Sequence, residues 1–237
     1  MPAVFVHGVP DTSVMWDPVL AELDRDDTVA LRLPGFGAPV PDGFHCTKEE
    51  YAAWIVDQLR AIGEPVDLVG HDWGSLLTQR VATTEPELVR TYTLADGAVC
   101  GPLHWHGLAQ QWATPDVGEQ VMELMTLETV PPALAEQGHP DPAGCATRLD
   151  DTMKQSILRL YRSATDIGAD WDPRTRGRER PGLILWGRDD AFGKPKRGED
   201  AAAAANARLR VLDGGHWAIF QHAAETAREL EAHWAIA

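Results

Sequence analysis

Six short apolar segments, separated by longer segments with helical periodicity, constrain the fold more than any other feature of the sequence. They are rich in Val and Leu, and several are apolar at successive positions, as expected of strands covered on both faces. Strands that alternate with helices predict a doubly wound parallel sheet, and therefore an α/β fold. The predicted strands are Ala3–Val6, Thr28–Leu31, Val66–Val69, Thr91–Leu94, Leu183–Trp186 and Leu209–Leu212.

The segments between these strands carry helix signals. Thr47 is followed three residues later by Glu50, which is the pattern of a capping box, and Gly63 suits the end of the same helix. We therefore predict a helix that begins after Thr47 and runs to Ile62. Further helices are predicted for Ser75–Thr83, for Ala218–Ala235 and for the segment that contains the alanine run 201–205.

A long stretch without a strand signal separates the fourth predicted strand from the fifth. Residues 101–180 show helical periodicity, which predicts a helical insertion lying over one edge of the sheet. Ligands in open α/β sheets bind beyond the carboxyl ends of the strands, where such an insertion would roof a pocket. We therefore divide the chain into a core, residues 1–100 and 181–237, and a helical cap, residues 101–180.

The balance of charge bears on the partners of the chain. The 237 residues carry a formal net charge of −15, and the sequence pI is about 4.9. Such a surface repels phosphate backbones, so nucleic acid is not expected as a partner. Two basic runs, residues 174–180 and 194–197, stand out against this background, and we interpret both as solvated loops or helix starts.

Cysteine usage and hydropathy indicate a compartment. The three cysteines are odd in number, and their spacing fits neither a zinc site nor a small disulfide scaffold, which favours a reducing compartment. The first residues show no basic region followed by a long apolar stretch, and no apolar run approaches the ~18 residues of a membrane helix. We therefore expect a soluble cytoplasmic protein without a membrane partner.

The strongest functional motif follows the third predicted strand. Gly70-His71-Asp72-Trp73-Gly74 precedes a predicted helix and has the form of a nucleophile elbow, G-x-Nu-x-G, with aspartate where serine is usual. The two glycines permit a sharp turn, and the start of the helix favours an ionised carboxylate. Because the chain contains no G-x-S-x-G, Asp72 is the candidate nucleophile.

Two other motifs lie after the first and last predicted strands. His-Gly-Val-Pro at residues 7–10 occupies the loop that supplies one N–H of the oxyanion hole, and the residue after the nucleophile supplies the other. Val9 and Trp73 are therefore the oxyanion-hole candidates. Gly-Gly-His-Trp at residues 214–217 brings in His216, and the chain order of nucleophile, acid and histidine matches that of hydrolases with such an elbow.

Three aspartates compete for the role of the acid that orients His216. Asp190 lies three residues past the glycine that ends the fifth strand, and it is our first choice. Asp96, which follows the fourth strand, and Asp189 are the alternatives. The two that do not take this role would cap loops.

Four motifs together resemble the epoxide hydrolase and haloalkane dehalogenase branch of the α/β-hydrolase superfamily. They are His-Gly-x-Pro at residues 7–10, Leu-Pro-Gly-Phe-Gly at 33–37, His-Asp-Trp-Gly at 71–74 and Gly-Gly-His-Trp at 214–217. In that branch the aspartate attacks carbon and forms an alkyl-enzyme ester, and the histidine activates the water that hydrolyses it. The usual sheet has two strands before the one that carries His-Gly-x-Pro. We therefore predict an α/β-hydrolase fold with a reduced, mostly parallel sheet of about six strands that lacks those two.

The predicted cap carries segments that resemble substrate-binding parts of the same branch. Tyr161 resembles the cap tyrosine that hydrogen-bonds the epoxide oxygen in epoxide hydrolases. His104 and Trp105 resemble a segment that helps to bind halide in haloacetate dehalogenases. His106 and Trp112 are further candidates for lining the substrate pocket.

Two departures from the branch limit the choice of substrate. Epoxide hydrolases usually carry a second cap tyrosine, but the other tyrosines here, Tyr51 and Tyr92, belong to the core. Haloacetate dehalogenases grip the substrate carboxylate with arginines just after the nucleophile, where this chain has Trp73 and Leu76. A haloacid substrate is therefore not expected.

Taken together, the motifs predict an epoxide hydrolase that acts through an ester on Asp72, which water activated by His216 hydrolyses to a diol. Tyr161, alone or together with His104, would donate to the leaving oxygen. Hydrolytic dehalogenation, with the halide held by Trp73, Trp105 and His104, is the alternative. A non-catalytic ligand-binding protein on the same scaffold is the third hypothesis. The resemblance implies neither cofactor nor metal, and partners limited to a small-molecule substrate and water, with a homodimer left open.

Overall fold

The computed structural model describes residues 1–172 and 180–236. In this part of the chain, the strands form one six-stranded sheet in the order β2-β1-β3-β4-β5-β6, and every neighbouring pair is parallel. The predicted six-stranded parallel sheet is confirmed. The observed strands are β1 Ala3–Val6, β2 Thr28–Leu31, β3 Val66–His71, β4 Val89–Ala95, β5 Gly182–Gly187 and β6 Arg208–Leu212.

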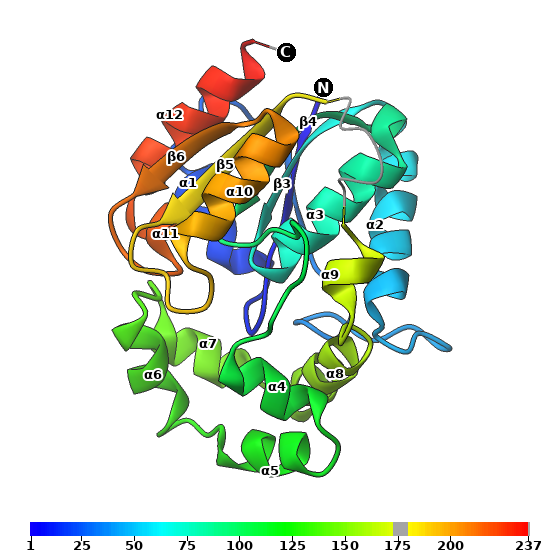
Figure 1. Ribbon diagram of the computed structural model, residues 1–237, viewed down its shortest axis with the longest axis vertical. Coiled ribbons are helices and arrows are strands. Elements are labelled where there is room, and N and C mark those ends of the chain that lie inside the picture. The colour runs from blue at the N-terminus through cyan, green and yellow to red at the C-terminus, as the bar shows by residue number, and fades with distance from the viewer. Residues whose placement is uncertain (173–179, 237) are drawn as a thin grey trace.

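Helices cover both faces of the sheet (Figure 1). Helices α2, α3 and α10 pack on one face, and the short helix α1 with α11 and α12 packs on the other. This arrangement explains why β1 and β3 are buried along their whole length. These helices are α1 Asp17–Leu20, α2 Lys48–Ile62, α3 Trp73–Thr84, α10 Pro195–Ala205, α11 Ala218–Gln221 and α12 Ala223–Trp234, and short 3₁₀ helices lie at Ser13–Trp16 and Pro86–Leu88.

Local signals account well for α2 but not for the last helix. The Thr47 side chain and the Glu50 side chain form the expected capping box, and Gly63 ends α2 in a left-handed conformation. The prediction of one helix over residues 218–235 is wrong, because His222 separates α11 from α12. The Thr226 hydroxyl donates to the Ile219 carbonyl at 2.8 Å, and so occupies an acceptor that a continuous helix would use.

The stretch between β4 and β5 contains only helices in its described part, which lies beyond the carboxyl ends of the strands (Figure 1). We call residues 101–180 the helical insertion; residues 173–179 of it lie outside the described residues. A buried contact ties it to the core, because His139 Nε2 lies 2.9 Å from Asp11 Oδ1. Its helices are α4 Gly107–Ala113, α5 Val117–Leu124, α6 Val130–Glu136, α7 Pro142–Arg148, α8 Asp151–Arg162 and α9 Ile167–Asp170.

Sheet register decides which loops meet. His71 pairs with Ala95, Ala95 with Leu185, and Gly187 with Leu212, so β3, β4, β5 and β6 end at one edge of the sheet. The residues that follow these strands therefore face the helical insertion together. None of the helices in the described part of the chain is long and apolar enough to span a membrane.

Candidate active site

The turn between β3 and α3 presents Asp72 at the carboxyl edge of the sheet. Asp72 has a φ of 53°, a conformation that non-glycine residues adopt only under strain. Its N–H donates to the Ala95 carbonyl at 2.9 Å, and its own carbonyl accepts from Ser75 N–H at 2.9 Å. A Cβ on Gly70 would lie 2.2 Å from the Gly74 oxygen, and one on Gly74 would lie 2.1 Å from the Val6 oxygen, so both glycines are required by close approach.

The two oxygens of the Asp72 carboxylate have different surroundings. Oδ2 accepts from the Val9 N–H at 3.3 Å and also from the Trp73 N–H. Oδ1 lies 3.2 Å from His216 Nε2. Only 18% of the Asp72 side chain is exposed, so these hydrogen bonds, rather than water, provide most of the stabilisation of the charged carboxylate. The structure thus brings together the two N–H groups that the sequence predicted for an oxyanion hole.

His216 lies between two aspartates and is 2% exposed. Its Nδ1 is 3.2 Å from Asp190 Oδ1, on the side of the ring opposite Asp72. The Asp190 carboxylate is itself fixed, because Oδ1 accepts from the Phe192 N–H at 2.8 Å. His71 packs its ring against that of His216 at a centroid distance of 4.8 Å, and its Nε2 lies 2.7 Å from the His216 carbonyl oxygen. The histidine is therefore held on three sides.

The other two candidate acids occupy different positions. Asp96 is buried close to His216 and Asp190, but its Oδ1 accepts from the Gly187 N–H at 2.7 Å, and no bond joins it to the histidine. Burial and the negative charge of Asp190 raise the pKa of Asp96 well above its usual range, which favours its neutral form. Asp189 is exposed. Of the three, Asp190 alone contacts a His216 ring nitrogen.

Opposite charges dominate the ionisation of the Asp72–His216 pair. Burial works against the charged form of Asp72, but the hydrogen bond and charge of His216 bring the pKa of the aspartate below its ordinary value. Burial likewise works against the charged form of His216, yet Asp190 and Asp72 raise its pKa well above 6.5. The resting site therefore favours a carboxylate at Asp72 and an imidazolium at His216.

A cavity of about 270 Å³ lies between this group and the helical insertion. Asp72 and His216 form its floor, residues of the core loops such as Val9, Phe192 and Trp217 form one side, and residues in and beside α4, α5, α6 and α8 form the rest of its wall. Most of the lining is apolar, and its polar members are Asp72, His106, Thr129, Tyr161 and His216, together with the indoles of Trp112 and Trp217. A largely apolar pocket with a few convergent polar groups is typical of a small-molecule site.

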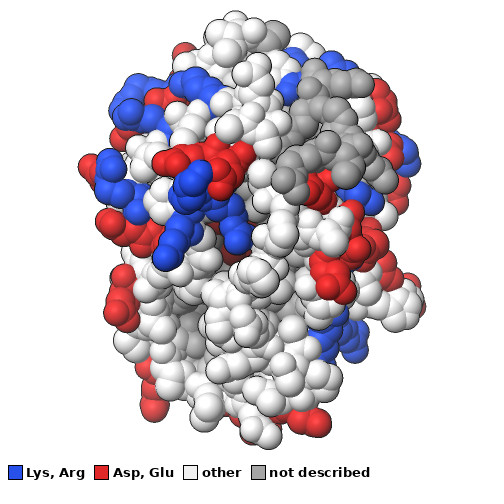
Figure 2. All heavy atoms as spheres, in the orientation of Figure 1, with Lys and Arg blue, Asp and Glu red and all other residues white. Residues whose placement is uncertain are grey.

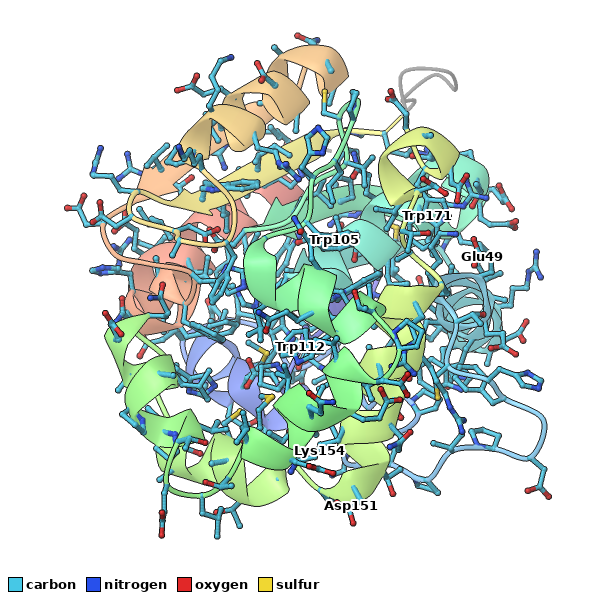
Figure 3. All side chains as sticks on the ribbon, turned by 60° about the horizontal axis from the view of Figure 1, so that its bottom comes forward. Glu49, Trp105, Trp112, Asp151, Lys154 and Trp171 are labelled. Atoms are coloured by element: carbon cyan, nitrogen blue, oxygen red, sulfur yellow. The ribbon has the colours of Figure 1, made fainter. Side chains whose placement is uncertain are left out.

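Aromatic side chains gather above the nucleophile candidate. The Tyr161 ring lies 5.3 Å from that of Trp73, 5.1 Å from that of Trp105 and 5.0 Å from that of Trp112. Figure 3 looks onto the helical insertion and shows Trp105 and Trp112 near the middle of the molecule. Burial and the charge of Asp72 raise the pKa of Tyr161 well above its ordinary value, so its hydroxyl stays protonated.

This geometry agrees with the match to known families. The sequence model of the alpha/beta hydrolase family matches residues 3–229. The chain belongs to the alpha/beta hydrolase family. The resemblance at the level of the superfamily and the fold is confirmed, because the sheet and its surrounding helices are those of an α/β hydrolase.

Individual relatives extend the comparison. An (E)-2-((N-methylformamido)methylene)succinate hydrolase of Acinetobacter baylyi is 28% identical over 98 residues, which span 40% of this chain and 37% of that protein. A haloalkane dehalogenase loop variant from Bradyrhizobium elkanii has a TM-score of 0.78 at 20% identity, over 99% of this chain and 90% of the other. An enol-lactonase from Burkholderia xenovorans has a TM-score of 0.74 at 18% identity, over 99% and 92%. These structures share the α/β-hydrolase fold with this chain.

Among the substrate-binding residues predicted from the sequence, Tyr161, His106 and Trp112 line the cavity. His104 and Trp105 do not line it. The His104 side chain is exposed, and the Trp105 indole N–H donates to the Ala164 carbonyl at 2.9 Å. Both instead border a smaller chamber of about 50 Å³ beside Asp72.

Sequence reasoning missed several residues that line the two chambers, Phe192 and Arg197 among them. Phe192 packs its ring 4.9 Å from that of His106 and 5.0 Å from that of His216, and it lines both chambers. Its position two residues after Asp190 is a signal that could have indicated it. The basic run 194–197 lies at the start of α10, in agreement with the interpretation as a helix start, but Arg197 within it is half-buried and lines the smaller chamber. The run 174–180 lies, except for Arg180, outside the described residues.

Proposed function

We propose that the protein hydrolyses epoxides to diols through a covalent ester on Asp72. One observation carries the proposal. A carboxylate occupies the elbow, with one oxygen held by the Val9 and Trp73 N–H groups and the other facing His216 and the cavity. A carboxylate so placed is suited to attack an electrophilic carbon, because it is ionised and needs no base.

In the first step, Asp72 Oδ1 forms a bond to an epoxide carbon while the bond from that carbon to the ring oxygen breaks. The electron pair of the broken bond goes to the oxygen, which becomes an alkoxide and needs a proton. The Tyr161 hydroxyl lines the same cavity and stays protonated, which supports its role as the donor. Opening the strained ring gives a 2-hydroxyalkyl ester of Asp72.

In the second step, His216 takes a proton from water, and the resulting hydroxide attacks the carboxyl carbon of the Asp72 ester. The bond from that carbon to the alkyl oxygen then breaks, the departing oxygen takes the proton from His216 to complete the diol, and the Asp72 carboxyl group returns a proton to His216 as it becomes a carboxylate again. Formation of the ester removes the negative charge of Asp72, which is one of the causes of the raised His216 pKa. The pKa of His216 therefore falls as the ester forms, and the proton that the ring gives up restores the Tyr161 hydroxyl. The neutral imidazole that remains can then act as a base. The Val9 and Trp73 N–H groups face Oδ2, where charge develops in the tetrahedral intermediate.

Hydrolytic dehalogenation is the second candidate, and a specific observation favours it. Among the described residues, neither the indole N–H of Trp73 nor that of Trp112 has a hydrogen-bond partner, although both are buried. Two free N–H donors near an attacking carboxylate would suit a departing halide, which is a weak base and needs no proton. Trp105 and His104 are poorer candidates for this role, because one N–H is already bonded and the other side chain is exposed.

Mass spectrometry of a His216→Gln variant tests both candidates. Loss of the base should slow ester hydrolysis more than ester formation, so the ester should accumulate after brief exposure to 1,2-epoxides or bromoalkanes. An epoxide would add its whole mass to Asp72, whereas a bromoalkane would add its alkyl group without bromine. The double variant Asp72→Ala/His216→Gln is the control and should carry neither adduct. If no compound of either panel labels the single variant, the covalent mechanism is wrong, and binding without catalysis becomes the better description.

A further inference from the structure

A second, smaller space lies beside Asp72. The chamber of about 50 Å³ shares Asp72, Tyr161, Phe192 and His216 with the larger cavity, and so adjoins it at the nucleophile. On its other side it shares Phe192, Gly193 and Arg197 with a surface hollow of about 380 Å³. Arg197, at the start of α10, therefore stands between the open hollow and the group that carries the chemistry.

Arg197 is a half-buried cation without a partner. No hydrogen bond or ion pair joins its guanidinium to another residue in the described part of the chain, although most arginines there have one. Its neighbour Lys196, by contrast, pairs with Asp200 and lies 3.9 Å from Glu199. None of its nitrogen atoms is among the buried unpartnered atoms of the described residues, so the guanidinium donors are reached by water and are free to bind a ligand.

The charge around the hollow departs from that of the whole molecule. The chain carries a net charge of −15, yet Lys194, Lys196 and Arg197 all border this hollow, and Asp200 is its one acidic member. Figure 2 shows the corresponding group of blue atoms at the lower end of α10, above a surface of the helical insertion with few charged atoms. A local cationic mouth on an acidic protein attracts anions that the rest of the surface repels.

We propose that Arg197 binds a carboxylate group of the substrate, with Lys194 at the mouth of the chamber. Guanidinium donors form a planar fork that matches a carboxylate, and half-burial strengthens such a pair relative to one in water. A space of about 50 Å³ holds a few water molecules, which is enough for a carboxylate but not for a chain. The apolar part of the substrate then occupies the cavity of about 270 Å³.

This inference deepens the proposed function and rests on it, since the substrate becomes an epoxide that bears a carboxylate. The reacting carbon would lie at Asp72, between the anionic end on Arg197 and the apolar end under the helical insertion. Asp96 also borders the chamber, and because burial and the charge of Asp190 raise its pKa, its neutral form does not repel an incoming anion. A purely structural Arg197, compensating the charge of Asp190, would instead be indifferent to the charge of the ligand.

Isothermal titration calorimetry with hexanoate and hexanamide tests the inference without requiring turnover. The two probes share chain length and shape and differ in charge. We expect the wild type to bind hexanoate about tenfold or more tightly than hexanamide, a difference of ~1.4 kcal/mol. Arg197→Met should remove this preference by weakening hexanoate alone, and Arg197→Lys should restore part of it. Lys196→Met is the matched control, because Lys196 borders the same hollow but is already paired.

Other outcomes decide against the inference. Equal affinity of the wild type for the two probes would overturn it, as would an Arg197→Met variant that loses both probes equally. If bromide competed with hexanamide but not with hexanoate, the anion would bind at a site other than Arg197. Adduct formation on Asp72 is measured separately. A hexanoate preference without any adduct would reject the proposed epoxide chemistry but support the anion site at Arg197. Adducts without the preference would support the epoxide chemistry and reject the anion site.

Discussion

The two sides of the cavity are built on different principles. On the side of the sheet, Asp72, His216 and Asp190 form a chain of contacts in which each group is held by a neighbour at 3.2 Å or by a backbone N–H. On the side of the helical insertion, Tyr161 and Trp112 contact each other through their rings, and the Trp112 N–H has no partner in the described part of the chain. On the sheet side the reacting groups are bonded to one another, whereas on the insertion side Trp112 offers an unused donor.

This difference indicates that the sheet side of the cavity carries the chemistry and the insertion side determines substrate selectivity. Groups that are already paired at rest are preorganised to hold and move charge, and their arrangement changes little with the substrate. Unused donors on an aromatic wall gain a partner only when a ligand arrives, so they discriminate between leaving groups. Variants on the sheet side should therefore affect every substrate, whereas variants on the insertion side should affect substrates unequally.

The largest effect is expected for Asp72→Ala. Removal of the attacking group should lower turnover by roughly 10⁴-fold or more on any substrate of the enzyme, because no other group replaces a lost nucleophile. The fold should persist, since Asp72 lies at the cavity floor rather than in the apolar core. Steady-state assays together with circular dichroism measure both effects. Near-normal turnover by a folded Asp72→Ala variant would show that Asp72 is not the nucleophile.

A pair of isosteric changes separates the two buried acids. Asp190→Asn should lower turnover by roughly 10⁴-fold, as loss of a triad acid does, because it removes the charge that stabilises the His216 imidazolium. Asp96→Asn should lower turnover much less. Asp96 favours its neutral form, and asparagine is likewise neutral and keeps an oxygen that accepts from the Gly187 N–H. The assay is turnover of the two variants on one substrate. The reverse ranking would make Asp96 the orienting acid.

Tyr161→Phe sharpens the comparison on the other side of the cavity. For an epoxide, this change removes the proton donor and should lower the rate by roughly 10²–10⁴-fold. For a bromoalkane, it removes one weak donor among several and should cost about tenfold, or ~1.4 kcal/mol. Parallel assays of diol formation and bromide release by wild type and variant measure the contrast. Equal losses on both substrates would mean that Tyr161 supports the fold rather than the leaving group.

The smallest effect concerns stability against pH. The pKa of His216 is raised in the folded protein, so its contribution to stability is fully present below the unfolded pKa of about 6.5 and is lost as pH rises through the folded value. The Tm difference between wild type and His216→Gln should therefore be largest in mild acid and shrink above neutral pH. Hydrogen bonds to a charged group suggest a free-energy difference of about 1.5–3 kcal/mol. A Tm difference independent of pH would indicate that His216 is uncharged in the fold.

Several features followed from the sequence alone because they depend on local backbone geometry. The alternation of apolar strands and helices specified a parallel sheet, and strands covered on both faces have a recognisable composition. Gly70 and Gly74 surround Asp72 because the turn leaves no room for a Cβ at either position. The positions of Val9 and His216 followed as well, since residues after neighbouring parallel strands meet at one edge of the sheet.

The tertiary structure alone decided which of several suitable side chains reach the cavity. Asp96 and Asp190 follow neighbouring strands, so the sequence preferred Asp190 but left Asp96 as an alternative. In the structure their directions differ, because Asp96 has a φ of 51° and its carboxyl group accepts from the Gly187 N–H. The exposure of His104 and the position of Arg197 depend on how the helical insertion and α10 pack against the core. Side-chain direction at such places is set by contacts between segments distant in the chain, and no local pattern records those contacts.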